Sequence, residues 1–258
     1  MGMFYGHIPP PPEEQQARLA ALLQLTSRGI PCILWGEDAL NYVYKVPTTL
    51  FDQQILVPDS LMRTASEVLQ EGKYVPVPFT QRYFDNFGYH SATSMFPHAI
   101  LLKHPDIPDE DPYKLDPLPG YILLLPQSYY GLDVRERERF QSMSPPLDPS
   151  YARIVVPKYH TFLEGLVRFM IHPPFELTNP HRKGIRRHQI FIGYLVRYRV
   201  EYEGDPREVP TRPYPEEDVI VSELETDEAR WFINKQFKTR LFVTIDEMLK
   251  YRDSHPSS

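Results

Sequence analysis

The sequence predicts an α/β protein, in which a mixed sheet with flanking helices is followed by a mostly helical C-terminal region. Short apolar runs that end at proline or glycine alternate with segments of helical periodicity over residues 13–140, which is typical of a sheet covered by helices. Beyond residue 150, helical periodicity predominates and charged residues become denser. The segment QSMSPPLDPS at 141–150 is typical of a linker, so we expect an α/β domain at 13–140 and a helical region at 151–250.

Local signals predict five elements in the first part of the chain: a helix at 13–27, a strand at 30–35, a helix at 37–44, a strand at 51–57 and a helix at 59–71. The first helix carries Leu19 and Leu22 on one face. The first strand is an apolar run that ends at Gly36. Pro58 stops the second strand, and the side chain of Asp59 is a suitable N-cap for the helix that follows.

Further elements are expected as strands at 98–103 and 121–125 and as helices at 159–171, 180–199 and 227–241. The strand at 121–125 is an apolar run between Gly120 and Pro126. The pair Asn179–Pro180 is typical of an N-cap followed by proline in the first helical turn, although residues 191–200 also fit a strand. The acidic, proline-rich residues 201–218 are predicted to form a surface loop.

The composition excludes several classes of protein. Of the 258 residues, 41% are hydrophobic, which is enough to bury a core and argues against a disordered chain. No run approaches the roughly 18 apolar residues of a membrane-spanning helix, and the N-terminal segment lacks the pattern of a secretory signal. The single cysteine cannot form an intrachain disulfide, and the net charge of −6 argues against a general nucleic-acid coat protein. We therefore expect a soluble, cytoplasmic protein with no membrane partner.

The most informative segment runs from Ile33 to Val57. It predicts a strand, then Gly36, a short helix, and a second strand that opens with Asp52. This outline resembles the nucleotidyltransferase superfamily, and within it the branch of abortive-infection toxin-like proteins and uncharacterised fungal relatives. The resemblance covers roughly residues 15–130. By contrast, the sequence contains no Walker-type loop, no dinucleotide-binding glycine motif, no nucleophile-elbow motif and no zinc-ligand spacing.

The resemblance implies a nucleotide site. Gly36 and Glu37 would lie at the turn that holds nucleotide phosphates, and Asp52 would be a metal ligand and catalytic residue. Carboxylates in such a site hold Mg²⁺, which stabilises the charge that develops on oxygen atoms during phosphoryl transfer. In this superfamily a helical second region often closes over the nucleotide, so Arg186 and Arg187 are candidate phosphate contacts. The implied activity is Mg²⁺-dependent transfer of a nucleotide to an acceptor, such as RNA or a protein.

Two departures from the superfamily's pattern support an alternative function. Alternate residues of a strand share a face, so a second metal ligand is expected two residues after Asp52, where this sequence has Gln54. A third acid is expected on a later strand, but the candidate strand supplies Lys103, and the nearby acids Asp85 and Asp106 lie outside the predicted strands. The alternative is a catalytically degenerate member of the fold that acts as a binding or regulatory module.

Charged residues also form two blocks in the second half of the chain. Residues 180–200 hold six lysines and arginines and no acid, whereas residues 201–228 hold eleven acids. The basic block could receive phosphate from a nucleotide or RNA, or the two blocks could pair across one surface, which is the interpretation that we favour. His160 and Glu164 are one helical turn apart, which favours a local contact over a shared metal ion.

Overall fold

A computed structural model describes residues 4–5, 8–79, 96–106, 118–176, 185–201 and 212–255. The predicted α/β class, the mixed sheet and the mostly helical C-terminal region are confirmed. Asp85 lies outside the described residues, as does the pair Asn179–Pro180 at which we expected a helix to begin.

A mixed sheet of seven strands forms the centre of the described part of the chain, with the strand order β5, β6, β7, β4, β2, β9, β8. The strand bounds are Ile33–Trp35 (β2), Gln53–Val57 (β4), Val75–Pro76 (β5), Ile100–Lys103 (β6), Tyr121–Pro126 (β7), Phe140–Ser142 (β8) and Val155–Pro157 (β9). β4 runs antiparallel to β2 and parallel to β7. A separate pair joins Phe4–Tyr5 (β1) to Thr48–Thr49 (β3).

The segment 141–150, which we expected to be a linker, begins inside one strand of the sheet, β8, and ends before the next, β9. β8 pairs antiparallel with β9, and β9 pairs parallel with β2. The sheet therefore includes residues on both sides of this segment, and β9 falls inside the range 151–250 that we expected to be mostly helical. These strands have only three residues each, which is too short for a periodic signal in the sequence.

Most of the described α-helices lie where the sequence predicts a helix. Their bounds are Pro12–Arg18 (α1), Ala20–Ser27 (α2), Gly36–Tyr42 (α3), Met62–Glu71 (α4), Tyr159–Ile171 (α6), Arg186–Val200 (α7), Pro215–Glu223 (α8), Asp227–Thr239 (α9) and Ile245–Ser254 (α10). The helix expected at 13–27 is interrupted at Leu19 and forms α1 and α2. Residues 191–200, which also fit a strand, are helical.

Among the α-helices of the described residues, α8 and α10 were not predicted, although the sequence contains a signal for each. α8 begins inside the acidic segment that we expected to be a loop, with Pro215 in its first turn and acids directly after it. α10 begins with a capping box, in which the Thr244 side chain accepts a hydrogen bond from the backbone N–H of Glu247 and the Glu247 side chain accepts one from the backbone N–H of Thr244. A threonine followed three residues later by glutamate is a known helix start.

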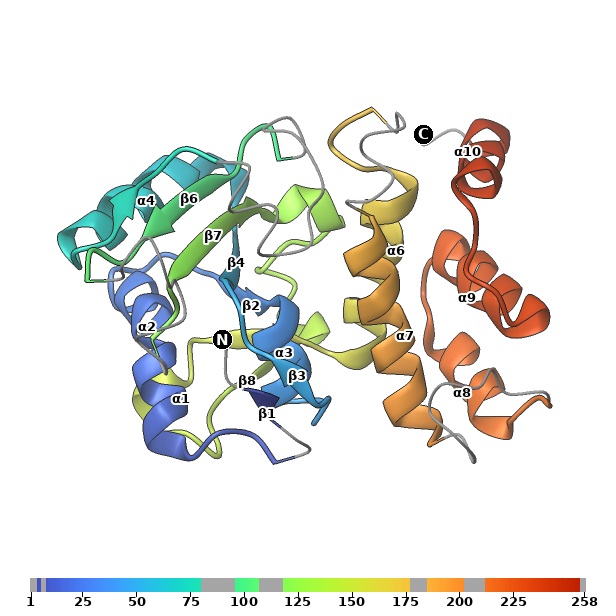
Figure 1. The fold of residues 1–258 in the computed structure, drawn as a ribbon, viewed down its shortest axis with the longest axis horizontal. Coiled ribbons are helices and arrows are strands. Elements are labelled where there is room, and N and C mark those ends of the chain that lie inside the picture. Colours follow the sequence, from blue (N-terminus) through green and yellow to red (C-terminus); the bar gives the residue numbers. More distant parts are fainter. Residues whose placement is uncertain are drawn as a thin grey trace.

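The C-terminal helices join the sheet through α6. Figure 1 shows α6 and α7 between the sheet and the outer helices α8, α9 and α10, with α1, α2 and α4 on the other side of the molecule. The ring of Trp35, at the end of β2, lies 4.4 Å from the rings of both Tyr130 and Phe162. Gly165 of α6 permits this approach, because a Cβ atom there would lie 2.9 Å from Trp35 Cη2. The sheet and the helical region therefore share one hydrophobic core.

Candidate functional site

Three of the residues predicted from the resemblance meet in a buried ion cluster. Glu37 lies in the first turn of α3, Asp52 immediately precedes β4, and Arg187 lies in the first turn of α7. Arg187 Nε donates to Glu37 Oε1 at 2.8 Å, while Arg187 Nη2 donates to the same oxygen and, at 3.0 Å, to Asp52 Oδ1. The side chains of Glu37, Asp52 and Arg187 are 4%, 0% and 9% exposed. The guanidinium therefore bridges two carboxylates inside the protein.

Burial controls the protonation of Glu37. Burial raises the pKa of Glu37 to about 7; the Arg187 guanidinium opposes this shift, and the charge of Asp52 adds to it. Glu37 Oε2 is buried and has no hydrogen-bond partner among the described residues. Burial therefore favours the neutral form of the Glu37 carboxyl, whereas the Arg187 guanidinium favours its ionised form.

A second buried ion pair holds the backbone around Asp52. Arg18 Nε lies 2.5 Å from Asp38 Oδ1, and Arg18 Nη2 lies 3.1 Å from Asp38 Oδ2. Arg18 Nη2 also donates to the backbone oxygen of Phe51 at 2.8 Å, and Gln53 Nε2 donates to the backbone oxygen of Arg18 at 2.9 Å. Since Phe51 and Gln53 flank Asp52 in the chain, these bonds position the carboxylate that Arg187 contacts.

The predicted phosphate turn at Gly36 is covered by a side chain. Gly36 has a φ of +67°, in the left-handed region that favours glycine. A Cβ atom on Gly36 would lie 2.9 Å from Cδ of Gln54, which pairs with Trp35 across β2 and β4. Both Gly36 and Gln54 are buried. The Gln54 amide therefore packs against Gly36 on the side where any larger residue would place its Cβ atom.

The remaining predicted residues do not join the cluster. Arg186 is exposed, so only Arg187 of these two adjacent arginines points into the protein. Asp106 is exposed and lies 3.8 Å from His104 Nδ1. Within the described ranges, no three His, Cys, Asp or Glu side chains form a group that could hold a metal ion. The third carboxylate of the superfamily's pattern is therefore not found beside Asp52 in this part of the chain.

Arg18, Asp38 and Gln53 were not identified from the sequence as parts of one site. Arg18 and Asp38 are 20 positions apart, and nothing in the local pattern distinguishes either from a charged residue at the surface. Their burial reflects how α1 and α3 approach β4, which is a property of the packed fold.

Glu164 of α6 anchors the start of α9 and does not use its oxygen atoms for the local contact that we expected with His160. Glu164 Oε1 accepts hydrogen bonds from the backbone N–H groups of Glu225 at 2.5 Å and Thr226 at 3.0 Å. Glu164 Oε2 accepts one from Arg139 Nη2 at 3.1 Å. Both oxygen atoms are therefore used in contacts between elements that are distant in the sequence.

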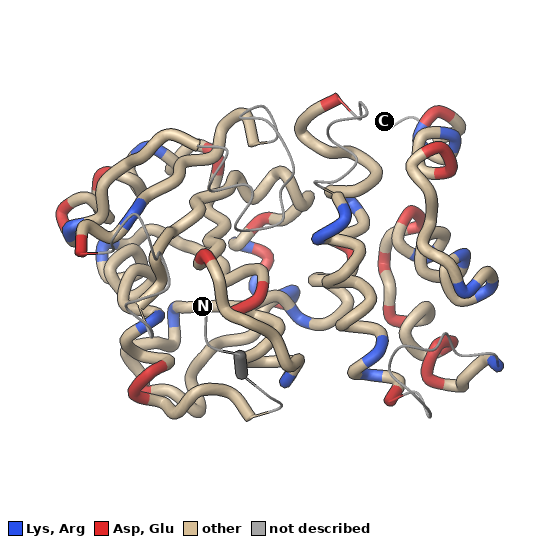
Figure 2. The backbone as a smooth tube through the Cα atoms, in the orientation of Figure 1, with Lys and Arg blue, Asp and Glu red and all other residues tan. Residues whose placement is uncertain are grey.

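The two charged blocks pair in part. Arg199, near the end of α7, lies 2.6 Å from Glu223 of α8, as the pairing interpretation predicts. Arg187, from the same block, turns inward instead, and Glu217 of α8 pairs at 2.5 Å with Arg240 at the end of α9. Figure 2 shows basic residues on α7 and acidic residues on the neighbouring α8.

No family model, no curated protein and no solved structure matches this chain. In the part of the chain that the structure describes, none of the helices combines the length and apolar character needed to cross a membrane. The function of the protein is therefore inferred from its own side chains.

Proposed function

We propose that this protein is a catalytically degenerate member of the nucleotidyltransferase-like fold that acts as a binding or regulatory module. The observation that carries the proposal is the position of the Arg187 guanidinium between Glu37 and Asp52. The guanidinium supplies positive charge where the superfamily that the sequence resembles holds Mg²⁺. In this proposal, the carboxylates attach α7 to the sheet and do not bind a substrate.

Replacing Arg187 by a metal ion would be unfavourable. Mg²⁺ requires near-octahedral oxygen ligands at about 2.0–2.1 Å and usually keeps several waters. Glu37 and Asp52 are almost fully buried, and the neutral amide of Gln54 occupies the position of a second metal-binding acid. Removing one partner from a buried ion pair costs about 3–5 kcal/mol. The closed cluster therefore competes strongly with metal binding.

Mg²⁺-dependent nucleotidyl transfer is the second candidate function. It is supported by the succession of Gly36, Glu37 and Asp52 along β2, α3 and β4. For transfer to occur, α7 would have to withdraw Arg187, and the Gln54 side chain would have to leave Gly36. The nucleotide, Mg²⁺ and an RNA or protein acceptor could then enter.

A transfer assay separates the two candidates. The wild-type chain is incubated with MgCl₂, each labelled ribonucleoside triphosphate in turn, and cellular RNA and protein as acceptors; nucleotide binding is measured in parallel by titration calorimetry. We expect neither label transfer nor heat of nucleotide binding. Transfer that is lost in Asp52→Asn but retained in Asp253→Asn, whose side chain is 73% exposed on α10, would overturn the proposal in favour of catalysis.

A further inference from the structure

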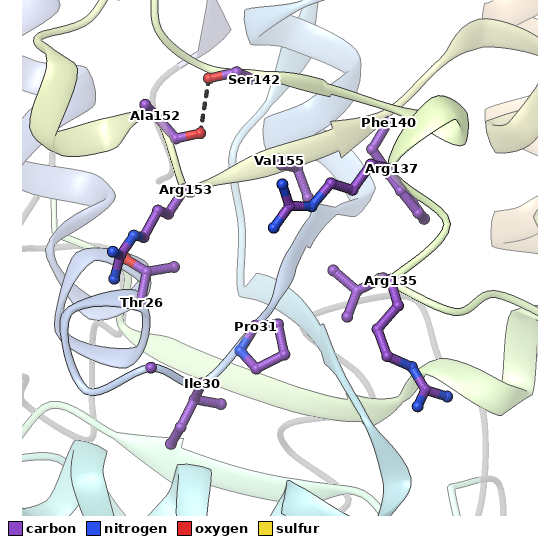
Figure 3. Close-up of a pocket in the computed structure, with 12 residues that line it drawn as sticks. Thr26, Ile30, Pro31, Arg135, Arg137, Phe140, Ser142, Ala152, Arg153 and Val155 are labelled. Atoms are coloured by element: carbon purple, nitrogen blue, oxygen red, sulfur yellow. Dashed lines mark hydrogen bonds between the residues drawn. The ribbon is translucent and has the colours of Figure 1, made fainter.

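A cavity of about 800 Å³ opens at the edge of the sheet formed by β8 and β9. Its walls come from the end of α2 and the start of β2, from residues 134–142, and from residues 152–155 (Figure 3). Ile30 and Pro31, which line this cavity, precede β2, whereas Glu37 of the ion cluster follows it. The cavity and the ion cluster are therefore at opposite ends of the same strand.

Two exposed arginines that line this cavity, Arg137 and Arg153, carry charge that is unpaired within the described residues. Arg135, a third arginine in the wall, is held by Asp133, with 2.5 Å between Arg135 Nη2 and Asp133 Oδ2. Arg137 and Arg153 have no hydrogen-bond or ion-pair partner for their guanidinium groups among the described residues. Figure 3 shows these two side chains extending over the cavity from the segments that precede β8 and β9. The cavity therefore carries a local positive charge in a protein whose net charge is −6.

The glutamates that alternate with arginines in the segment 133–139 do not line the cavity. Residues 133–139 alternate between acidic and basic side chains at most positions, but Glu136 and Glu138 are not among the residues that line the cavity. Glu136 pairs with Arg139 at 3.1 Å, outside the cavity wall. The cavity is thus lined by two of the three arginines of this segment, Arg135 and Arg137, and by neither of its glutamates.

The rest of the wall suits the body of a small organic molecule. Ile30, Pro31, Val134, Phe140 and Val155 contribute apolar surface. Small-molecule sites have volumes of about 300–1,000 Å³ and combine mostly apolar walls with a few polar groups that fix orientation. Guanidinium groups bind phosphate through paired, charge-assisted hydrogen bonds.

We propose that this cavity binds a small organic phosphate. Its phosphate group pairs with Arg137 and Arg153, and its apolar part lies against Pro31 and Phe140. This site goes beyond the proposed function, because it uses none of the residues of the Glu37–Asp52–Arg187 cluster.

Titration calorimetry with the full chain tests the site, with phenyl phosphate and inorganic phosphate as probes. We expect phenyl phosphate to bind about tenfold more tightly than inorganic phosphate, because its ring buries apolar surface. Arg137→Ala and Arg153→Ala should each weaken phenyl phosphate binding about tenfold or more, as expected for the loss of a charged hydrogen-bond donor. Arg63→Ala, which removes an arginine of α4 that is 92% exposed, should leave the affinity unchanged.

A filling variant tests the cavity separately from its charge. Ala152 lines the cavity and is exposed, so Ala152→Trp should block phenyl phosphate while the circular dichroism spectrum stays that of the wild type. No binding of phenyl phosphate at about 10 mM, or binding that survives both arginine substitutions, would overturn the proposal. Tighter and steeply salt-dependent binding of a uridine oligonucleotide would also overturn it, by assigning the arginines to a nucleic-acid backbone. None of these measurements involves nucleotidyl transfer, so their failure is distinct from failure of the proposed function.

Discussion

Arg187 and Asp52 are 135 positions apart in the sequence and are joined by a hydrogen bond of 3.0 Å in the protein interior. Together with Glu37, they form a charged contact between α7 and the sheet, close to the apolar contact that α6 makes through Trp35. A buried charge is unfavourable unless it is paired. Glu37 and Asp52 therefore both depend on Arg187 for a compensating charge, and Arg187 depends on them.

The first prediction concerns the charge of Arg187. Arg187→Met keeps much of the side-chain volume but leaves Glu37 and Asp52 buried without their shared cation. We expect the free energy of unfolding, measured by urea denaturation, to fall by about 3–5 kcal/mol. Arg186→Met, at the adjacent exposed position, should change it by no more than about 0.5 kcal/mol. Equal losses in the two variants would contradict the assignment of Arg187 to the cluster.

The second prediction concerns pH. The pKa of Glu37 is raised by burial from 4.5 to about 7 in the folded chain, so between these values the unfolded chain releases a proton that the folded chain keeps. Protonated Glu37 therefore stabilises the folded chain below pH 4.5, and this stabilisation is lost as the pH rises to about 7. The free energy of unfolding falls by at most about 1.4 kcal/mol per pH unit in this window.

Urea denaturation at a series of pH values measures this dependence. The free energy of unfolding of the wild type should fall across this window relative to that of Glu37→Gln, which cannot release the proton. Glu138→Gln, at an exposed position, should follow the wild-type profile. A wild type and a Glu37→Gln variant with parallel profiles would show that Glu37 is already ionised throughout the window.

The third prediction concerns the contact between α6 and the sheet. Gly165→Ala would place a Cβ atom 2.9 Å from Trp35 Cη2 and 3.3 Å from Tyr130 Cβ, so we expect destabilisation of about 1–3 kcal/mol. Gly193→Ala in α7 is the matched control, because its nearest neighbours are atoms of Phe242 at 4.0 Å. The control should stabilise the protein by about 0.5–1 kcal/mol through the higher helix propensity of alanine. Thermal unfolding monitored by circular dichroism distinguishes the two variants. Stabilisation by Gly165→Ala would disprove the close approach of Gly165 to Trp35.

The fourth prediction concerns Glu164. Glu164→Ala removes the acceptor for the backbone N–H groups of Glu225 and Thr226, so we expect a loss of about 1–3 kcal/mol in the free energy of unfolding. Hydrogen exchange at the first turn of α9 should accelerate in the same variant. His160→Ala should have little effect on either measurement. Equal effects from the two substitutions would instead support the local contact between His160 and Glu164 that the sequence suggested.

Much of the fold could be predicted because its signals are local. The apolar runs of β2, β4 and β7 and the periodic apolar faces of α6 and α9 are contained within each segment. Strands of three residues have too few positions for such a pattern, which explains why β8 and β9 were missed. The starts of α8 and α10 did carry local signals, at Pro215 and Thr244, and could have been found.

The site was predictable only in its separate parts. The outline of a strand, a turn and a second strand singled out Gly36, Glu37 and Asp52, and the block of basic residues singled out Arg186 and Arg187. Nothing in that outline indicated that Gln54 would cover Gly36, because this contact depends on the pairing of β2 with β4.

Hydrophobic periodicity acts over a few neighbouring residues, so the sequence alone was sufficient to predict the class of fold and most of the helices. That Arg187, and not Arg186, joins Glu37 and Asp52, and that Arg18 pairs with Asp38, became evident only in the packed fold. A buried ion pair depends on which faces of distant elements pack together. Arg186 and Arg187 are the same type of residue at adjacent positions. On a helix, however, adjacent side chains point in different directions, and only Arg187 faces the sheet.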